Sequence, residues 1–201
     1  MKQLLEGVWT WSVFDEARQV DFNGYYVDTG TARALIDPVP FDAEVEASIE
    51  RLGRPTDVII TNKDHRRAAA RARARFGAAI VVHALDRPLL DVPADRAVSD
   101  GDVVAGALRV VHLPDQKSPG EMALLWPARR VLFLGDALWG KPAGRLTMLP
   151  AAKYADVARA RAGLRRLAEL DVDAVCMGDG TPIISGAGEV LRATVRGLAA
   201  V

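Results

Sequence analysis

Three aspartates each follow a short apolar run, at the point where a β-strand is expected to end. They are Asp64, Asp136 and Asp179, and His65 comes directly after the first of them. If these strands lie in one sheet and point the same way, their C-terminal ends meet at one edge, where open α/β proteins bind ligands. Converging carboxylates repel one another unless a cation or protons neutralise them. Three carboxylates and an imidazole form a mixed oxygen and nitrogen site that suits Zn²⁺, Mn²⁺ or Fe²⁺. The competing interpretation is that each aspartate caps a helix or turn by itself.

The residues around Asp64 predict a strand–helix–strand unit. Residues 57–61 are rich in β-branched apolar side chains, and an alanine-rich pattern predicts a helix over 66–76 that ends at Gly77. Residues 79–83 form the next apolar run, and such a unit takes a right-handed parallel crossover. His83 ends this second strand and could face a cleft, although a hydrogen-bonded structural role is the more common one for a lone histidine.

Further strands and helices surround this unit. They are, in chain order, a β-meander over 3–39, an amphipathic helix over 42–52 with Asp42 as its N-cap, a β-hairpin of 121–126 and 130–134, a long helix over 151–170, a buried strand over 172–177 and a terminal helix over 189–199. The segment 138–150 contains Pro142, Gly144 and Pro150, so we expect it to be irregular, and it could form a lid or rim.

The charge balance argues against nucleic acid or an anionic membrane as a partner. The 201 residues include 26 Lys and Arg and 26 Asp and Glu, so the formal net charge is zero. Arg67, Arg71 and Arg75 recur at every fourth position of the expected helix, and such a stripe can contact phosphates. A solvated outer face explains it more simply. We expect a small-molecule substrate as the partner and a homodimer as the general prior for the assembly.

Length and composition are those of a soluble globular protein with one domain over residues 1–201. No apolar run approaches the ~18 residues of a membrane-spanning helix. Glu6 stands where a signal peptide would be apolar, so we expect a cytoplasmic protein. The single cysteine, Cys176, excludes a disulfide within the chain and is interpreted as a small buried hydrophobic residue.

The order of these motifs resembles the metallo-β-lactamase-fold superfamily over nearly the whole chain. The matching segments are Leu35-Ile36-Asp37-Pro38, Ile59-Ile60-Thr61 before Asp64-His65, Lys117-Ser118-Pro119-Gly120, Leu132-Phe133-Leu134-Gly135-Asp136 and Gly178-Asp179-Gly180. The resemblance implies an α/β fold of four layers, an αββα sandwich, with the site at the edge where the two sheets meet. It also implies metal-dependent hydrolysis of substrates such as esters, thioesters, lactams or phosphodiesters.

All three ligands of the family's first, histidine-rich metal position are missing. Aligned on the family signature His-x-His-x-Asp-His, the first two histidine positions hold Ile60 and Asn62. Lys117 replaces the histidine that usually precedes a Thr-Pro-Gly turn. The full family set needs five histidines, whereas this chain has 3 in total. The count alone therefore excludes a standard two-zinc site.

Every position of the family's second metal still holds a residue that can bind an ion. These residues are Asp64, His65, Asp136 and, in place of the family's last histidine, Asp179. We therefore hypothesise at most one divalent ion, Zn²⁺, Mn²⁺ or Fe²⁺. Lys117, or with less support Lys63, would place an ammonium group where the other ion stood and neutralise Asp136.

Two functions remain open at this stage. In a hydrolase, Asp64 would orient or deprotonate the attacking water, and Lys117 would steady an anionic substrate or the developing oxyanion. Trp139 and Lys141 of the irregular segment would line the pocket. In a non-catalytic descendant, the site would have become a hydrogen-bond network of aspartate, lysine and asparagine that binds a small ligand or a partner. A salt bridge between Asp136 and Lys117 with no room for an ion would favour the second function.

Overall fold

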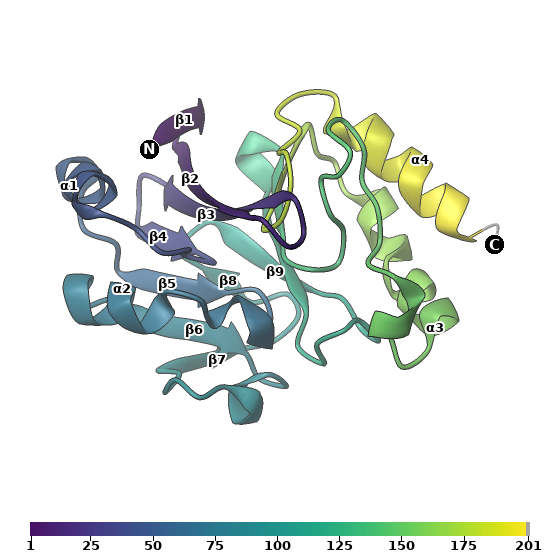
Figure 1. Cartoon of the computed structure of the whole chain (residues 1–201), viewed down its shortest axis with the longest axis horizontal. Coiled ribbons are helices and arrows are strands. Elements are labelled where there is room, and N and C mark those ends of the chain that lie inside the picture. Colours follow the sequence, from purple (N-terminus) through teal and green to yellow (C-terminus); the bar gives the residue numbers. More distant parts are fainter. Residues whose placement is uncertain (200–201) are drawn as a thin grey trace.

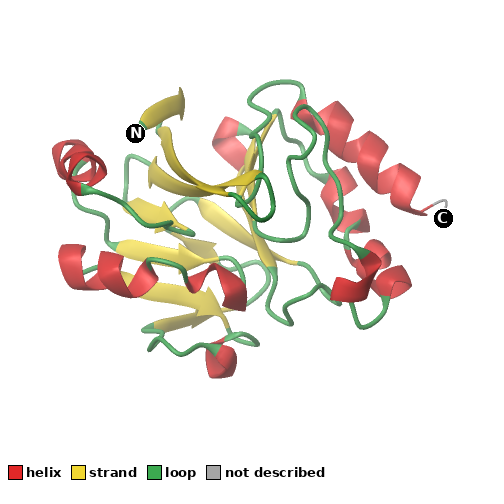
Figure 2. Ribbon diagram, viewed as in Figure 1, coloured by secondary structure: helices red, strands yellow, loops and turns green. Residues whose placement is uncertain are grey.

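Two β-sheets pack face to face, and helices cover both outer faces (Figure 1, Figure 2). The computed structural model describes residues 1–199. The first sheet comes from the N-terminal half of the chain and the second from the C-terminal half. Helix, sheet, sheet and helix follow one another as layers, which confirms the expected αββα sandwich.

The first sheet has seven strands in chain order. They are β1 (Lys2–Leu5), β2 (Val8–Asp15), β3 (Val20–Asp28), β4 (Arg33–Ile36), β5 (Asp57–Ile60), β6 (Ala79–His83) and β7 (Arg96–Val98). The first four pair antiparallel, as the predicted meander requires. From β4 to β7 the pairing is parallel, and β4, β5 and β6 therefore end on the same side of the sheet.

The second sheet has five strands in the order β12-β11-β10-β9-β8. They are β8 (Val103–Val104), β9 (Leu108–His112), β10 (Met122–Trp126), β11 (Val131–Leu134) and β12 (Ala174–Met177). β10 and β11 form the predicted hairpin, with Leu124 opposite Phe133. β12 pairs parallel to β11, so the residues after these two strands lie at one edge.

The alternation of side chains along each strand divides the apolar residues among three cores. Ile59 of β5 and Phe133 of β11 point between the sheets, where they join one buried cluster. Their neighbours in sequence point outward. Ile60 packs with the helices on the first sheet, and Leu132 packs with those on the second. Because β5 and β11 are covered on both faces, their sequences are nearly continuous runs of apolar residues.

Within residues 1–199, four α-helices and several single turns of 3₁₀-helix complete the fold. The α-helices are α1 (Ala43–Leu52), α2 (Ala69–Phe76), α3 (Val157–Gly163) and α4 (Ala187–Ala199), and the 3₁₀ turns are η1 (Lys63–Arg66), η2 (Arg87–Leu89), η3 (Pro127–Arg129), η4 (Ala151–Lys153) and η5 (Arg165–Glu169). Asp42 caps α1 by accepting a hydrogen bond from the Val45 N–H, as predicted. In the described part of the chain no helix combines the length and the apolarity that crossing a bilayer requires.

Two expected helices are wrong in their extent. The helix predicted over 66–76 starts only at Ala69, because η1 precedes it and Arg67 has a φ of 22°. The single helix predicted over 151–170 is three pieces. Asp156 is extended and accepts hydrogen bonds from the N–H groups of Ala158 and Arg159, so it begins a new helix where continuous helix was expected.

The three strands that precede the aspartates belong to two sheets, so the expectation that they share one sheet is wrong. Asp64 follows β5 of the first sheet, whereas Asp136 and Asp179 follow β11 and β12 of the second. The strand ends nevertheless face the same edge of the sandwich. His65 lies 3.3 Å from Asp136 and 4.0 Å from Asp179.

Candidate metal centre

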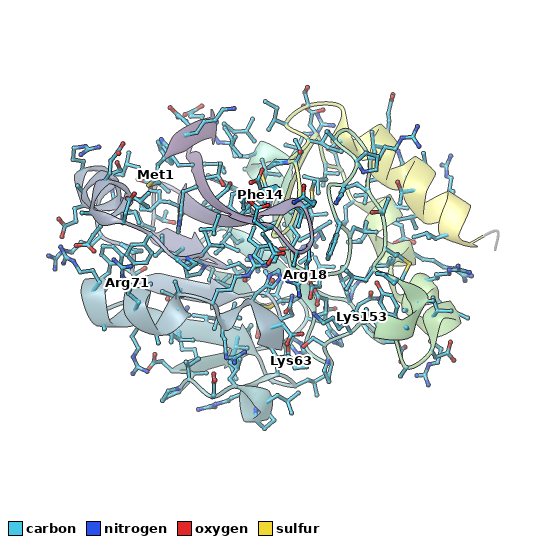
Figure 3. The ribbon with its side chains drawn as sticks, viewed as in Figure 1. Met1, Phe14, Arg18, Lys63, Arg71 and Lys153 are labelled. Carbon is cyan, nitrogen blue, oxygen red and sulfur yellow. The ribbon has the colours of Figure 1, made fainter. Side chains whose placement is uncertain are left out.

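A cleft of about 670 Å³ opens at the edge where the two sheets meet. Its floor carries the charged groups and its walls are largely apolar. Its lining includes Val13, Phe14, Arg18, Phe22, Val39, Asp64, His65, Arg67, Lys117, Asp136, Trp139, Leu149, Lys153 and Asp179. Figure 3 shows Phe14 and Arg18 near the β2–β3 turn and Lys153 on the opposite side of this region. The residues that chemistry singled out in the sequence therefore lie in a cavity with room for a small molecule.

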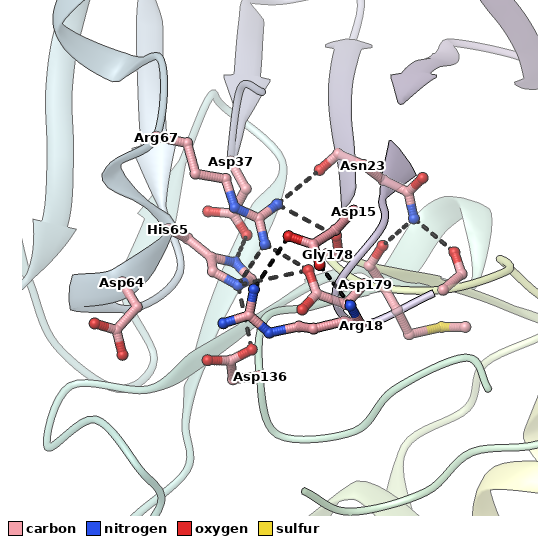
Figure 4. Close-up of polar contacts among 12 residues, drawn as sticks. Asp15, Arg18, Asn23, Asp37, Asp64, His65, Arg67, Asp136, Gly178 and Asp179 are labelled. Carbon is pink, nitrogen blue, oxygen red and sulfur yellow. Dashed lines mark hydrogen bonds and ion pairs between the residues drawn. The ribbon is translucent and has the colours of Figure 1, made fainter. Parts of the chain in front are cut away.

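His65 is held rigidly at the floor of this cleft (Figure 4). Its Nδ1 lies 2.8 Å from Asp37 Oδ2. Asp37 also accepts hydrogen bonds from the backbone N–H of Thr61 at 2.8 Å and from its hydroxyl at 2.6 Å. A Cβ on Gly178 would lie only 2.5 Å from His65 Cε1, so glycine is required for this close approach. Asp37 stands where a carboxylate would orient a metal-binding histidine.

Three potential ligand atoms converge beside His65. Its Nε2 lies 3.3 Å from Asp136 Oδ1 and 4.0 Å from Asp179 Oδ1, and the three ligand atoms lie within 4.8 Å of one another. An ion bound at about 2.1 Å by each ligand needs ligand atoms roughly 3–4 Å apart. The set therefore fits one divalent ion after a small closure.

Asp64 lies next to this group but is turned away from it. Its Oδ2 is 2.9 Å from Lys117 Nζ and 3.0 Å from Lys63 Nζ. Burial raises the pKa of Asp64, but the hydrogen bonds from the two lysines outweigh burial and lower it. The structure thus brings together three of the four residues expected to bind metal, and it places the fourth among lysines.

Lys117 bridges the two carboxylates that flank it. Its Nζ lies 2.6 Å from Asp136 Oδ2 and 2.9 Å from Asp64 Oδ2. Burial lowers the pKa of Lys117, but the two carboxylates outweigh burial and raise it. Burial likewise opposes ionisation of Asp136, and His65 and Lys117 outweigh it and hold the pKa of Asp136 far below its usual range. The ammonium group is therefore charged and stands against Asp136 as the sequence suggested.

Arg67 is a site residue that the residue pattern does not reveal, because its spacing with Arg71 and Arg75 predicts a solvated helix face. Its Nη2 lies 2.5 Å from Asp179 Oδ1 and 3.0 Å from His65 Nε2, and its guanidinium stacks on Phe22 at 4.6 Å. The reversed backbone at Arg67 turns the side chain inward. A φ of 22° leaves no mark in the residue pattern, whereas Arg71 and Arg75 do lie outside and pair with Glu46.

The protonation of His65 is decided by the groups on either side of the ring. Burial and the charge of Arg67 lower the pKa of His65, but Asp37 and Asp136 outweigh them and raise it to about 10. The 3.0 Å contact from Arg67 to Nε2 is a hydrogen bond only if Nε2 carries a lone pair. In the neutral form of the ring, with the proton on Nδ1 facing Asp37, Nε2 is available to an ion.

Two buried acids support the site from behind, and neither was recognised in the sequence. Asp86 is fully buried and accepts hydrogen bonds from the Lys63 N–H at 2.8 Å, the Ser118 hydroxyl at 2.5 Å and the Gly120 N–H at 2.7 Å. It therefore fixes the two segments that carry Lys63 and Lys117. It sits at the start of η2, where the sequence shows only a polar turn.

Glu121 is the second of these acids. Its Oε1 accepts hydrogen bonds from the N–H groups of Asp136 at 2.8 Å and Ala137 at 3.2 Å. Among residues 1–199 its Oε2 has no partner. Burial, helped by the charge of Asp136, raises the pKa of Glu121 well above its usual range, which favours the protonated side chain.

Glu121→Gln is expected to change the free energy of unfolding by less than about 1 kcal/mol, because the amide oxygen can replace Oε1 and the raised pKa of Glu121 favours a neutral side chain there. Glu121→Leu should cost about 2–4 kcal/mol, since it leaves two buried N–H groups without an acceptor. Urea unfolding of both variants measures the difference. Equal losses for Gln and Leu would show that Glu121 is ionised in the native protein.

The remaining candidates lie outside the ligand group. Trp139 lines the cleft, as expected, and its buried Nε1 has no partner within residues 1–199. Lys141 does not line the cleft; it donates hydrogen bonds to the carbonyl oxygens of Arg18 and Gln19. His83 is buried and stacks on His112 with 4.4 Å between the rings, which agrees with a structural role.

The family's first metal position does not fit an ion here. Ile60 points into the apolar core beneath the helices. Asn62 caps η1 through its side-chain oxygen, and its amide group faces Glu121 at 3.4 Å. Lys117 fills the third ligand position with a cation. Of the two positions, only the group of His65, Asp136 and Asp179 offers donor atoms that suit a metal.

An αββα sandwich with carboxylates and a histidine at the shared edge of its sheets defines a metallo-hydrolase type of fold. A family model described as the metallo-beta-lactamase superfamily matches residues 1–198, and the chain belongs to this superfamily. This confirms the resemblance drawn from the motifs. Membership supports a metal-dependent hydrolase in general terms, and the His65, Asp136 and Asp179 group agrees with metal binding.

Solved structures of the same fold resemble the chain at low sequence identity. The metallo-beta-lactamase family protein TTHA1429 from Thermus thermophilus is 20% identical, with 98% of this chain and 80% of that chain covered and a TM-score of 0.72. The di-iron-bound form of TTHA1623 is 27% identical over 86% and 93% of the two chains, with a TM-score of 0.69. The mono-zinc form of FIM-1 from Pseudomonas aeruginosa is 17% identical over 98% and 95%, with a TM-score of 0.76.

Proposed function

We propose that the chain is a hydrolase that holds at most one divalent ion, Zn²⁺, Mn²⁺ or Fe²⁺, on His65, Asp136 and Asp179. One observation carries the proposal: three suitable ligand atoms lie within 4.8 Å of one another on the floor of a cleft. The relative TTHA1623 was solved with two irons and FIM-1 with one zinc, which supports metal binding in this fold. The proposed substrate is a small ester, thioester or phosphodiester.

The ion, when bound, would supply a Lewis acid that polarises a carbonyl or phosphoryl oxygen. Asp64 reaches the cleft with 36% of its side chain exposed and is proposed to orient the attacking water and accept its proton. Lys117 neutralises Asp136 and offers its ammonium group to developing negative charge. The apolar walls around Phe22 and Trp139 would exclude water from the substrate.

Hydrolysis of p-nitrophenyl acetate, a simple thioester and bis-p-nitrophenyl phosphate tests the proposal, with Mn²⁺, Zn²⁺ or Fe²⁺ added to protein stripped by chelator. We expect turnover that depends on the ion and falls at least about 100-fold in Asp136→Asn and Asp64→Ala. Asp91→Asn, on the surface, is the control. Turnover that persists in chelator, or that Asp136→Asn leaves unchanged, contradicts a metal-dependent hydrolase.

The second candidate is a non-catalytic protein that binds a small ligand, and the ionic network favours it. Asp64, Asp136 and Asp179 are matched by Lys63, Lys117 and Arg67, so the described site has no uncompensated carboxylate among these three. The predicted salt bridge between Asp136 and Lys117 is present. Two results together would support this candidate over the first. Small carboxylates or phosphates would raise the unfolding midpoint equally with and without chelator, and none of the substrates above would be turned over.

We also propose that the partner is a small molecule and neither a nucleic acid nor a membrane, that the protein is cytoplasmic, and that it forms a homodimer. The cleft volume of about 670 Å³ supports the first of these. The pairing of Arg71 and Arg75 with Glu46 supports the second, since it leaves that helix face partly neutralised. Sedimentation equilibrium measures the oligomeric state, and a monomer at micromolar concentration would contradict the homodimer.

A further inference from the structure

The guanidinium of Arg67 lies on the same atoms that would bind an ion. Its Nη2 donates to Asp179 Oδ1 at 2.5 Å and lies 3.0 Å from His65 Nε2. These are two of the three atoms in the ligand group. An ion held at about 2.1 Å by both of these ligand atoms would lie in van der Waals overlap with Nη2, so the ion and the guanidinium cannot occupy this place together. Two cations at this spacing would also repel strongly in a buried site.

Lys117 does not conflict with an ion in this way. Its ammonium group binds Oδ2 of Asp136, whereas the ligand group uses Oδ1 of the same carboxylate. Its other partner, Asp64, lies outside the ligand group. Lys117 can therefore stay in place when an ion binds, and Arg67 cannot.

We propose that Arg67 is a resident cation that competes with the metal ion, so that an ion binds only when the Arg67 side chain leaves Asp179 and His65. The inference rests on the ligand group of the proposed function. In the absence of metal, Arg67 neutralises Asp179. Burial and the charge of Asp136 raise the pKa of Asp179, and the charge of Arg67 opposes that rise. The chain thus carries a built-in substitute for its own metal ion.

The surroundings of Arg67 allow this exchange. The side chain is 12% exposed and lines the cleft, so it can move toward the cavity without opening the core. Its guanidinium already lies 4.6 Å from the Phe22 ring and 3.3 Å from the Gly178 carbonyl oxygen. Phe22 lies at the cleft wall and can hold the displaced group. Asp15, which also lines the cleft and pairs with Arg18, is a further carboxylate on that side.

Metal affinity of Arg67 variants tests the competition directly. Calorimetric titration with Mn²⁺ and Zn²⁺ is compared for the full wild-type chain, Arg67→Ala and Arg67→Met, the last of which keeps an aliphatic stem over Phe22. We expect both variants to bind one ion at least about 100-fold more tightly than the wild type. Arg71→Ala, in the next turn of the chain and paired with Glu46 on the surface, is the matched control and should bind like the wild type.

Thermal unfolding with and without the ion gives a second measurement for variants that are less stable. The midpoint of Arg67→Ala and Arg67→Met should fall without metal and recover when Mn²⁺ or Zn²⁺ is added, and the control should show no such recovery.

The outcomes separate this inference from the proposed function. Weak binding by the wild type and tight binding by both variants supports both. No binding by the wild type with tight binding by the variants supports the competition and overturns the metal-dependent hydrolase. Equal affinity in all proteins overturns the competition and leaves the hydrolase standing. No binding by any protein overturns both.

Discussion

Asp86→Ala is expected to lower the free energy of unfolding by about 4 kcal/mol, the largest loss expected of any single substitution around the site. The carboxylate is fully buried and accepts three hydrogen bonds, from Lys63 N, Ser118 Oγ and Gly120 N. Alanine would leave three donors without an acceptor, and each unsatisfied buried donor costs about 1–3 kcal/mol. The hydrogen bond from Lys63 is only partly buried, which places the total in the lower half of the summed range.

The loss corresponds to a fall of about 8–16 °C in the unfolding midpoint for a chain of this size. Calorimetry and urea unfolding measure it. Asp91→Ala is the control, because Asp91 is exposed and pairs only with Arg66 among the described residues, so its loss should stay within about 0.5 kcal/mol. If Asp86→Ala matched this control, the 63–66 and 117–120 segments would be held by other contacts.

Lys117→Met is expected to cost about 3 kcal/mol of stability, with a midpoint lower by about 6–12 °C. The methionine keeps much of the aliphatic length, so the effect isolates the ammonium group. Without it Asp136, which is 5% exposed, loses its closest cation, and Asp64 loses one of two. Removing one partner of a buried ion pair strands the other charge. The lysine is 27% exposed, which places the expected cost at the low end for such pairs.

Divalent cations should restore part of the stability that Lys117→Met loses. If Lys117 neutralises Asp136 as an ion would, an added Mn²⁺ can take its place between Asp64 and Asp136. Thermal unfolding with and without Mn²⁺ measures this recovery, with Lys153→Met, at the exposed rim of the cleft, as the control. A variant that unfolds at the wild-type midpoint would show that the Lys117 salt bridge contributes nothing to the native state.

Most of the fold is predictable because its strands are short, apolar and bounded by turn residues. The run at β5 and the runs at β11 and β12 are apolar on both faces, as strands buried in a sandwich must be. The helix α1 has both a capping aspartate and a terminal glycine. Local signals of this kind fail over 151–170, because Asp156 is compatible with a helix by composition and breaks it only through its capping hydrogen bonds.

The supporting acids and Arg67 could not be predicted, because their partners are far away along the chain. Asp37 holds His65 from 28 residues away, and Asp86 holds Ser118 from 32. Arg67 reaches Asp179 across 112 residues. No local pattern distinguishes such residues from solvated ones, and the reversed backbone at Arg67 depends on packing rather than on residue type.

The sequence by itself therefore determined the apolar strands and the three acids and the histidine at their ends, which follow from residue types and spacing. The layers of the sandwich and the loss of the histidine-rich metal position were implied by the resemblance of the motifs to the family. Only the tertiary structure decided that Asp64 faces lysines, that Asp136 divides its two oxygens between Lys117 and the ligand group, and that Arg67 occupies that group. The physical reason is that side-chain direction in a site built from two sheets depends on how the sheets meet, and that contact joins residues the chain keeps far apart.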